Sequence, residues 1–211
     1  MRLTSLLSVA FAAALFTACS SGGAPANARV ATPSPIAAGT PSPLVIPSPT
    51  IPFLRCDTAD LEMQLIHVGV GLGNVGGLIE ARNKSSRDCD LYGYAGVQLL
   101  DSIGRPLPTK VIWSTSSYIF GVDQVEVVVG LPAGTVPINP VRPVPGHAYL
   151  PISWNEVQEP CSEASKLEVT PPDAYNSLVI SASPAGGAPG VMYFCSGGTV
   201  IINPTRVAQA F

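Results

Sequence analysis

Short runs of alternating apolar and polar residues dominate the chain, and no long stretch carries apolar residues at helical spacing. A period of two is typical of a β-strand with one buried face. The clearest run alternates two sets of side chains, with Ala148, Leu150, Ile152 and Trp154 on one face and His147, Tyr149, Pro151 and Ser153 on the other. Trp154 is therefore expected in the core. Pro151 lacks a backbone N–H, which predicts that this strand lies at a sheet edge or on a bulge.

Further strands are predicted wherever the same alternation lies between Gly, Pro and Ser clusters. They cover residues 61–70 with a bulge near Leu65–Ile66, then 77–83, 94–100, 111–113, 125–129, 167–169, 178–181 and 199–202. Short strands at this spacing predict an all-β fold, an immunoglobulin-like two-sheet β-sandwich of about eight strands.

A glycine motif within residues 69–77 matches the dinucleotide-binding fingerprint, with glycines at 71, 73 and 76. In a nucleotide-binding fold this loop must open a helix. Here the loop runs into residues 77–83, whose apolar residues recur at every second position, as in a β-strand. The motif is therefore interpreted as a hairpin turn.

A polar corner at residues 83–94 closes one predicted strand and opens the next. Asn83 has the parity of Ile79 and Ala81, so its amide should point inward, where it needs hydrogen-bond partners. Backbone groups of residues 85–89 are the nearest candidates. Asp88 and Asp90 are interpreted as solvated loop charges, because the further carboxylates that a calcium site requires do not follow.

The N-terminus has the features of a secretory signal, with Arg2, an apolar run from Leu6 to Phe16, and small residues before Cys19. Residues 1–18 are predicted as a signal peptide. A cysteine at this place resembles a bacterial lipobox, so Cys19 is expected to carry lipid; the alternative is a plain signal peptide. Residues 19–52 form a predicted tether rich in Pro, Ser and Thr, and residues 53–211 the folded domain.

Composition limits the possible partners. Only 12% of the 211 residues are charged, the formal net charge is −3, and no Lys/Arg cluster could neutralise phosphates, which argues against nucleic acid. Beyond Cys19 the cysteines are Cys56, Cys89, Cys161 and Cys195, an even number that suits an oxidising compartment. Of the three possible pairings, Cys56–Cys89 with Cys161–Cys195 is favoured, because each pair brackets one pair of predicted strands. A metal site is the alternative, although no Cys-x-x-Cys spacing supports it.

Residues 111–139 are the least regular part of the domain and hold three aromatic candidates for ligand binding, Trp113, Tyr118 and Phe120. Trp and Tyr are residue types that interfaces favour. The alternative is that these rings form core under a long loop.

A set of spaced residues covering roughly residues 56–204 resembles a family of bacterial envelope lipoproteins with a four-cysteine domain of unknown function. The set comprises Cys56, Asn83, Cys89-x-Leu91-x-Gly93-Tyr94, Pro145-Gly146-x-Ala148, Trp154, Cys161, Leu167-x-Val169-x-Pro171-Pro172 and Cys195-x-Gly197. The resemblance implies a β-sandwich in an exported, often lipid-anchored protein. It implies no activity.

Three functions are considered. The favoured one is a non-catalytic module without cofactor, held to the bacterial cell membrane by lipid and binding an envelope protein or glycan. A secreted hydrolase using His67 or His147 is the alternative, but no hydrolase motif accompanies these histidines. A metal-handling lipoprotein using Met63 and Met192 is a third; these methionines are isolated, whereas copper carriers cluster soft ligands.

Overall fold

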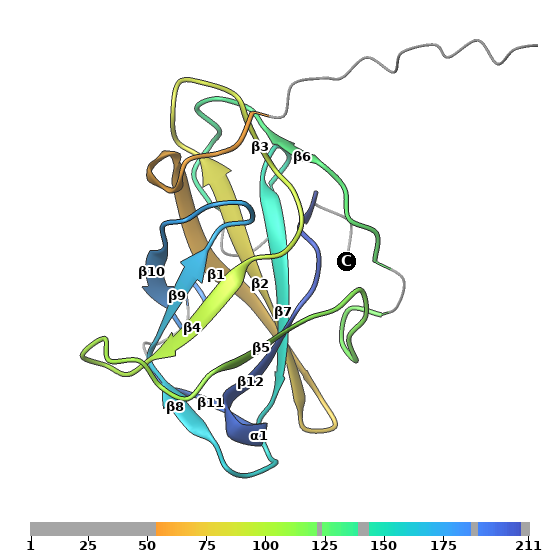
Figure 1. Cartoon of the computed structure of the whole chain (residues 1–211), viewed down its shortest axis with the longest axis vertical. Helices are drawn as coiled ribbons and strands as arrows, with labels where there is room; N and C mark the ends of the chain where they lie inside the picture. The colour runs from red at the N-terminus through yellow and green to blue at the C-terminus, as the bar shows by residue number, and fades with distance from the viewer. Residues whose placement is uncertain (1–53, 122–123, 139–143, 187–189, 208–211) are drawn as a thin grey trace, which may run out of the picture. The chain divides into compact units, whose positions relative to one another are not determined.

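The largest sheet forms one layer of the fold and has six strands (Figure 1). Its order is β1 (Leu61–Gly71), β2 (Asn74–Asn83), β7 (Ala148–Asn155), β12 (Thr199–Ile202) and β5 (Lys110–Trp113), with β13 (Arg206–Val207) also paired to β7. β1 and β2 form the expected hairpin around Leu72 and Gly73, and their register shifts between Leu65 and His67, where the bulge was predicted.

Three smaller sheets complete the fold. The three-stranded sheet has the order β10 (Leu178–Ser181), β9 (Lys166–Thr170) and β4 (Gly96–Leu100). Two pairs are β11 (Met192–Phe194) with β8 (Ser162–Ala164), and β3 (Cys89–Leu91) with β6 (Val129–Leu131). A 3₁₀ helix spans Thr58–Asp60 and a single helical turn, α1, spans Cys195–Gly198. The nearly all-β, sandwich-like fold is therefore confirmed.

This computed structural model describes residues 54–121, 124–138, 144–186 and 190–207, which fall in one compact unit, residues 49–211. The predicted signal peptide (1–18), the lipidation site Cys19 and the tether (19–52) lie outside the described residues. Within the described ranges, none of the helices has the length and apolar character needed to span a lipid bilayer.

The main core lies between the large sheet and the three smaller ones. Trp154 is 3% exposed and its ring centroid lies 4.6 Å from that of Phe194, so the predicted core position of Trp154 is confirmed. Leu65, Ile79 and Leu150 come from the large sheet, and Leu99 and Leu167 from the three-stranded sheet. Burying these side chains supplies the main stabilising free energy, at about 25 cal/mol per Å² of apolar surface.

The large sheet is also buried on its second face. Ile66, Leu78 and Tyr149 form a smaller cluster there, covered by Phe120, Ile138 and Ala185. These covering residues belong to the segments between strands, which fold back over the sheet. Side chains on both faces of β7 are therefore buried, from Ala148 through Trp154.

β7 is a central strand, which corrects the edge position predicted from its proline. Pro151 pairs with Leu78 of β2 on one side. On the other side the ladder is interrupted, because β12 pairs with residues 152–154 and β13 with residues 148–149. Pro151 lies at this gap, where its carbonyl accepts a hydrogen bond from Asn203 N–H at 3.0 Å. A missing N–H is tolerated here because no strand residue needs it.

The strand predicted over residues 125–129 is wrong for most of its length. Val125, Val127 and Val128 are 76%, 43% and 58% exposed and belong to no strand. Only Val129 enters β6, which pairs with β3. β-branched residues favour extended backbone, but a strand also requires a partner, and residues 124–128 have none.

Two disulfides join Cys56 to Cys89 and Cys161 to Cys195, the pairing that the sequence favours. The first ties the start of the domain to β3, and the second joins the residue before β8 to α1. Disulfides persist in oxidising compartments, which indicates an extracytoplasmic location.

Candidate functional site

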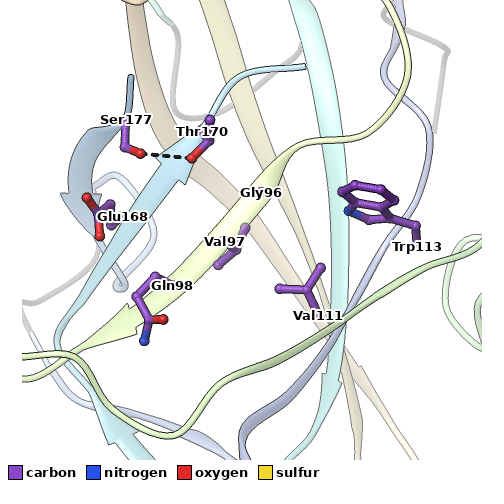
Figure 2. A pocket seen from close by; sticks show the side chains of 8 residues that line it. All are labelled: Gly96, Val97, Gln98, Val111, Trp113, Glu168, Thr170 and Ser177. Carbon is purple, nitrogen blue, oxygen red and sulfur yellow. Dashed lines mark hydrogen bonds between the residues drawn. The ribbon is translucent and has the colours of Figure 1, made fainter. Parts of the chain in front are cut away.

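A surface hollow of about 500 Å³ lies beside the exposed indole of Trp113 (Figure 2). Its walls come from β4 and β9 of the three-stranded sheet and from β5 of the large sheet, so it forms where the edges of two sheets approach each other. The lining residues are Gly96, Val97, Gln98, Val111, Trp113, Glu168, Thr170 and Ser177.

Gly96 contributes backbone without a side chain to the wall of the hollow. Gly96 pairs with Thr170 and Gln98 pairs with Glu168, so these four positions share the outer face of the three-stranded sheet. A Cβ at position 96 would lie 3.2 Å from the Cβ of Thr170, a tight contact. A glycine inside a strand often marks a close approach of another molecule.

Trp113 is held rigidly although 63% of its surface is exposed. Its indole Nε1 donates a hydrogen bond to the Ala95 carbonyl at 3.1 Å, and its ring stacks on Tyr94 with centroids 5.9 Å apart. The end of β5 is also fixed, because Ser114 N–H donates to the Ile202 carbonyl at 3.0 Å and the Asn203 amide donates to the Ser114 carbonyl at 2.8 Å. A fixed, exposed aromatic face loses little conformational entropy when a ligand covers it.

The polar floor of the hollow is partly organised by internal hydrogen bonds. The Gln98 amide nitrogen donates to the Leu107 carbonyl at 2.8 Å, which orients its side chain. The hydroxyls of Thr170 and Ser177 lie 2.8 Å apart. The carboxylate of Glu168 adds a charge-bearing acceptor to the same floor, so the surface beside Trp113 offers several hydrogen-bonding groups.

A second hollow of about 430 Å³ adjoins the first and shares Gly96, Trp113 and Thr170 with it. We call the two together the Trp113 groove. The second hollow is lined by Tyr92, Gly93, Tyr94, Gly96, Trp113, Glu126, Thr170, Pro171, Asp173 and Ala174. It therefore adds two tyrosines and two carboxylates to the exposed indole.

The carboxylate of Glu126 lies next to both tyrosines. A Cβ built on Gly93, between the two, would be 3.8 Å from Glu126 Oε2. The negative charge of Glu126 raises the pKa of Tyr92. Partial burial and then Glu126 raise the pKa of Tyr94. Hydrogen bonds to Glu126 contribute to both shifts, so the two phenols and this carboxylate form one polar cluster in the groove.

The Trp113 groove is acidic. Glu126, Glu168 and Asp173 line it, whereas none of the described residues along its walls is Lys, Arg or His. The described part of the chain forms its side-chain ion pairs elsewhere, as Arg82–Glu62, Arg87–Asp57, Arg87–Asp60, Arg105–Asp101 and His147–Glu80. The groove carboxylates thus have no basic partner among the described residues.

The three aromatic candidates from the sequence occupy different surroundings. Trp113 lines the groove. Tyr118 is 86% exposed and lines a separate hollow of about 180 Å³ next to Ser153 and Thr199. Phe120 is half-buried against the cluster around Tyr149, with the Arg206 guanidinium 5.3 Å from its ring centroid. The structure therefore does not bring the three together.

Sequence reasoning missed Tyr92, Tyr94 and Glu126 as site residues. The corner containing the two tyrosines was interpreted as architecture that launches the next strand. The spacing Tyr92-x-Tyr94 gave no reliable signal, because Gly93 between them has a φ of 92° and the backbone is not extended there. Glu126 carried no signal, because only the folded chain places residues 124–128 beside this corner.

Asn83 has the structural role that the sequence predicts for it in the corner at residues 83–94, and its side chain is fully buried. Its Nδ2 donates to the carbonyls of Arg87 at 2.6 Å and Leu131 at 3.1 Å, and its Oδ1 accepts from Ser85 N–H at 2.9 Å. Asp88 Oδ1 accepts from Ala133 N–H at 2.8 Å, and Asp90 Oδ2 from Leu54 N–H at 3.0 Å. Both aspartates thus orient neighbouring backbone.

A buried network on the second face of the large sheet was also missed. Glu80, His147 and Tyr149 are each at most 1% exposed. Glu80 Oε1 lies 2.7 Å from His147 Nδ1 and accepts a hydrogen bond from the Tyr149 hydroxyl at 2.6 Å. His147 Nε2 lies 2.9 Å from the Val136 carbonyl, which can only accept, so Nε2 carries the hydrogen. The available signal was that His147 and Tyr149 are two residues apart in a predicted strand, so their side chains lie on the same face.

His147 therefore lies within hydrogen-bond reach of a carboxylate, which is the minimum that a hydrolase would need. Both of its ring nitrogens are nevertheless occupied by acceptor oxygens, and its side chain is closed off from solvent. A general base needs a free nitrogen facing a nucleophile. Within residues 54–121, 124–138, 144–186 and 190–207, no group of three or more His, Cys, Asp or Glu residues could hold a metal ion.

Together the fold and the groove define a disulfide-linked, sandwich-like β-domain with an open acidic and aromatic surface groove. Residues 56–197 match the family described as "Domain of unknown function (DUF4232)", and the chain belongs to this family. No curated protein matches the chain. No solved structure matches it either.

Proposed function

We propose that this protein is a lipid-anchored, extracytoplasmic, non-catalytic module that binds a component of the bacterial cell envelope in the Trp113 groove. The observation that carries the proposal is the exposed indole of Trp113, which Tyr94 and Ala95 hold beside a hollow that none of the described side chains fills. Largely pre-formed concave surfaces with an aromatic wall and a few polar groups are the usual form of ligand sites.

The location part of the proposal rests on the signal-like N-terminus, the lipobox-like Cys19 and the two disulfides. Acyl chains at Cys19 would hold the protein at the membrane without a spanning segment. The Pro-rich residues 19–52 would act as a spacer at about 3.1 Å per residue. Such a spacer suits a domain that must reach material away from the membrane surface.

The non-catalytic part rests on the chemistry of the groove. Its walls contain no His, Cys or Lys among the described residues, so it lacks the usual nucleophile and base pairs. Of its three carboxylates, Glu168 lines one hollow and Glu126 and Asp173 line the other, and Glu126 is engaged by hydrogen bonds with Tyr92 and Tyr94. Binding is the function that this arrangement supports best.

The experiment is retention of the full-length protein, kept in detergent throughout, on envelope fractions from which lipid has been extracted, so that acyl chains at Cys19 cannot themselves retain the protein. Trp113→Ala should reduce retention at least about fivefold, because indoles dominate the energy of many interfaces. Tyr193→Ala is the matched control, since Tyr193 is 51% exposed and lies outside the groove. Equal retention of the wild type and Trp113→Ala, with both proteins folded by circular dichroism, would contradict the proposal.

A further inference from the structure

The free edge of β4 indicates how the ligand is recognised. In an antiparallel strand, each residue directs its N–H and its C=O toward the same neighbouring strand, and successive residues alternate between the two sides. Leu99 N–H donates to Thr109 Oγ1 at 3.0 Å, and the Leu99 carbonyl accepts from Leu107 N–H at 2.9 Å, so the odd-numbered residues of β4 face away from β9. At the other end, the Ala95 carbonyl accepts from the indole of Trp113.

The backbone groups at both ends of this edge already have hydrogen-bond partners. Only those of Val97, between the two ends, are left for an added strand. Peptides that extend a sheet bind through a row of backbone hydrogen bonds along an exposed edge. A strand added to β4 could pair with one residue only. The geometry thus favours a ligand recognised by side chains over an extended peptide.

The side chains of the groove suit a sugar chain. The exposed face of Trp113 is flat and apolar, and the C–H groups on one face of a pyranose ring pack well against such a surface. Gln98, Glu168, Thr170 and Ser177 surround it with groups that can bond hydroxyls. The hollow beside Gly96 leaves room for a ring stacked on the indole.

The charge of the groove selects among sugars. Tyr92, the stacked pair Tyr94 and Trp113, Glu126 and Asp173 all line the same hollow. Aromatic faces and carboxylates together stabilise a cation that has left bulk water. An anionic sugar would meet three carboxylates without a basic partner, which opposes its binding.

We infer that the Trp113 groove binds a polysaccharide whose sugars carry free amino groups. One sugar ring stacks on Trp113, and a protonated amine enters the hollow formed by Tyr92, Tyr94, Glu126 and Asp173. The inference rests on the proposed function and assigns the chemical class of its ligand.

The test is isothermal titration calorimetry of the full-length protein with three hexamers: glucosamine, N-acetylglucosamine and lysine. At about pH 5.5 the glucosamine amines are protonated and exposed carboxylates are ionised. The glucosamine hexamer should bind at least about tenfold more tightly than its N-acetylated counterpart. The lysine hexamer, which has the charge without the sugar ring, should bind more weakly than the glucosamine hexamer.

Glu126→Gln provides the sharper comparison, because it removes the charge and keeps the shape of an exposed side chain. It should weaken binding of the glucosamine hexamer about fivefold and weaken the N-acetylglucosamine hexamer clearly less, because only the first ligand carries the amine charge. Glu163→Gln, an exposed glutamate outside the groove, should change neither affinity. These results together support a specific amine site.

Three results would overturn the inference: no binding of the glucosamine hexamer, equal binding of the two sugars, or tighter binding of the lysine hexamer. Each of these three results can be distinguished from a failure of the proposed binding function. Trp113-dependent retention on envelope fractions, together with any of these results, leaves the binding module intact and removes the amino sugar. Loss of that retention removes the binding function itself.

Discussion

His147 Nδ1 lies 2.7 Å from Glu80 Oε1, and both side chains are fully buried between the large sheet and the segments that cover it. The pair joins neighbouring strands β2 and β7, and Tyr149 completes it by donating to the same carboxylate oxygen. Buried polar groups of this kind are costly when they lose a partner.

His147→Ala should destabilise the domain by about 3 to 5 kcal/mol, because it leaves the Glu80 carboxylate buried with Tyr149 alone. Denaturant unfolding followed by circular dichroism measures the change. The double variant Glu80→Leu with His147→Leu removes both polar groups and should recover much of the loss. A loss below about 1 kcal/mol in His147→Ala would show that the network contributes little.

The stability of the protein should fall at alkaline pH through Tyr149. Burial first, and then the hydrogen bond to Glu80, raise the pKa of Tyr149 in the folded state. A phenol in the unfolded chain titrates near pH 10, so its contribution to stability is complete below about pH 10 and declines as the pH rises further. Denaturant unfolding of the wild type between about pH 8 and pH 11 should show this decline.

Tyr149→Phe should show a shallower decline over the same pH range, because it has no phenol to ionise at this position. Tyr92→Phe is the control, since solvent screens the exposed Tyr92 and its raised pKa has little effect on stability. Parallel curves for the wild type and Tyr149→Phe would contradict the assignment.

Asn83→Ala should cost about 3 kcal/mol, because it leaves the carbonyls of Arg87 and Leu131 and the N–H of Ser85 without the partner that now satisfies them. Ser85→Ala is the comparison. It removes one hydroxyl at the partly exposed side of the same corner and should cost about 1 kcal/mol. Similar losses in the two variants would mean that Asn83 does not organise the corner.

Gly198→Ala should destabilise far more than Gly104→Ala, although both glycines have positive φ, +76° and +86°. A Cβ at Gly198 would lie 2.0 Å from the Pro108 carbonyl oxygen, whereas a Cβ at Gly104 would meet nothing within 4 Å. Backbone strain costs about 1 to 2 kcal/mol at each position, and only Gly198 adds a clash with backbone. Thermal unfolding of the two variants checks the difference, and equal melting temperatures would refute it.

Local patterns were sufficient where one face of a strand is buried and turn residues mark its ends. The bulge after Leu65, the hairpin at Leu72–Gly73 and the inward Asn83 all follow from parity and turn chemistry. Cysteine positions relative to the predicted strands favoured the pairing that the structure has. Each of these features depends on contacts that are short in sequence or on a covalent framework.

Long-range contacts explain what the sequence did not reveal. Pro151 lies in a central strand because β12 and β13, some fifty residues later in the chain, leave a gap beside it. Val125, Val127 and Val128 have β propensity but no partner strand. The network of Glu80, His147 and Tyr149 is buried because Phe120, Ile138 and Ala185 cover the second face of the sheet and the Val136 carbonyl meets His147.

The sequence by itself determined the β-rich class and the cysteine framework, because period-two patterning, turn residues and cysteine positions are local properties. It named Trp113 as a candidate but left open whether the indole is exposed or in the core. Only the tertiary structure decided that Trp113 faces Gly96 and Glu168 across two sheet edges, with Tyr92, Tyr94 and Glu126 on its other side. Those neighbours come from three separate segments of the chain, residues 92–96, Glu126 and Glu168. Their meeting depends on sheet order and on the return of residues 124–128, which no local pattern records.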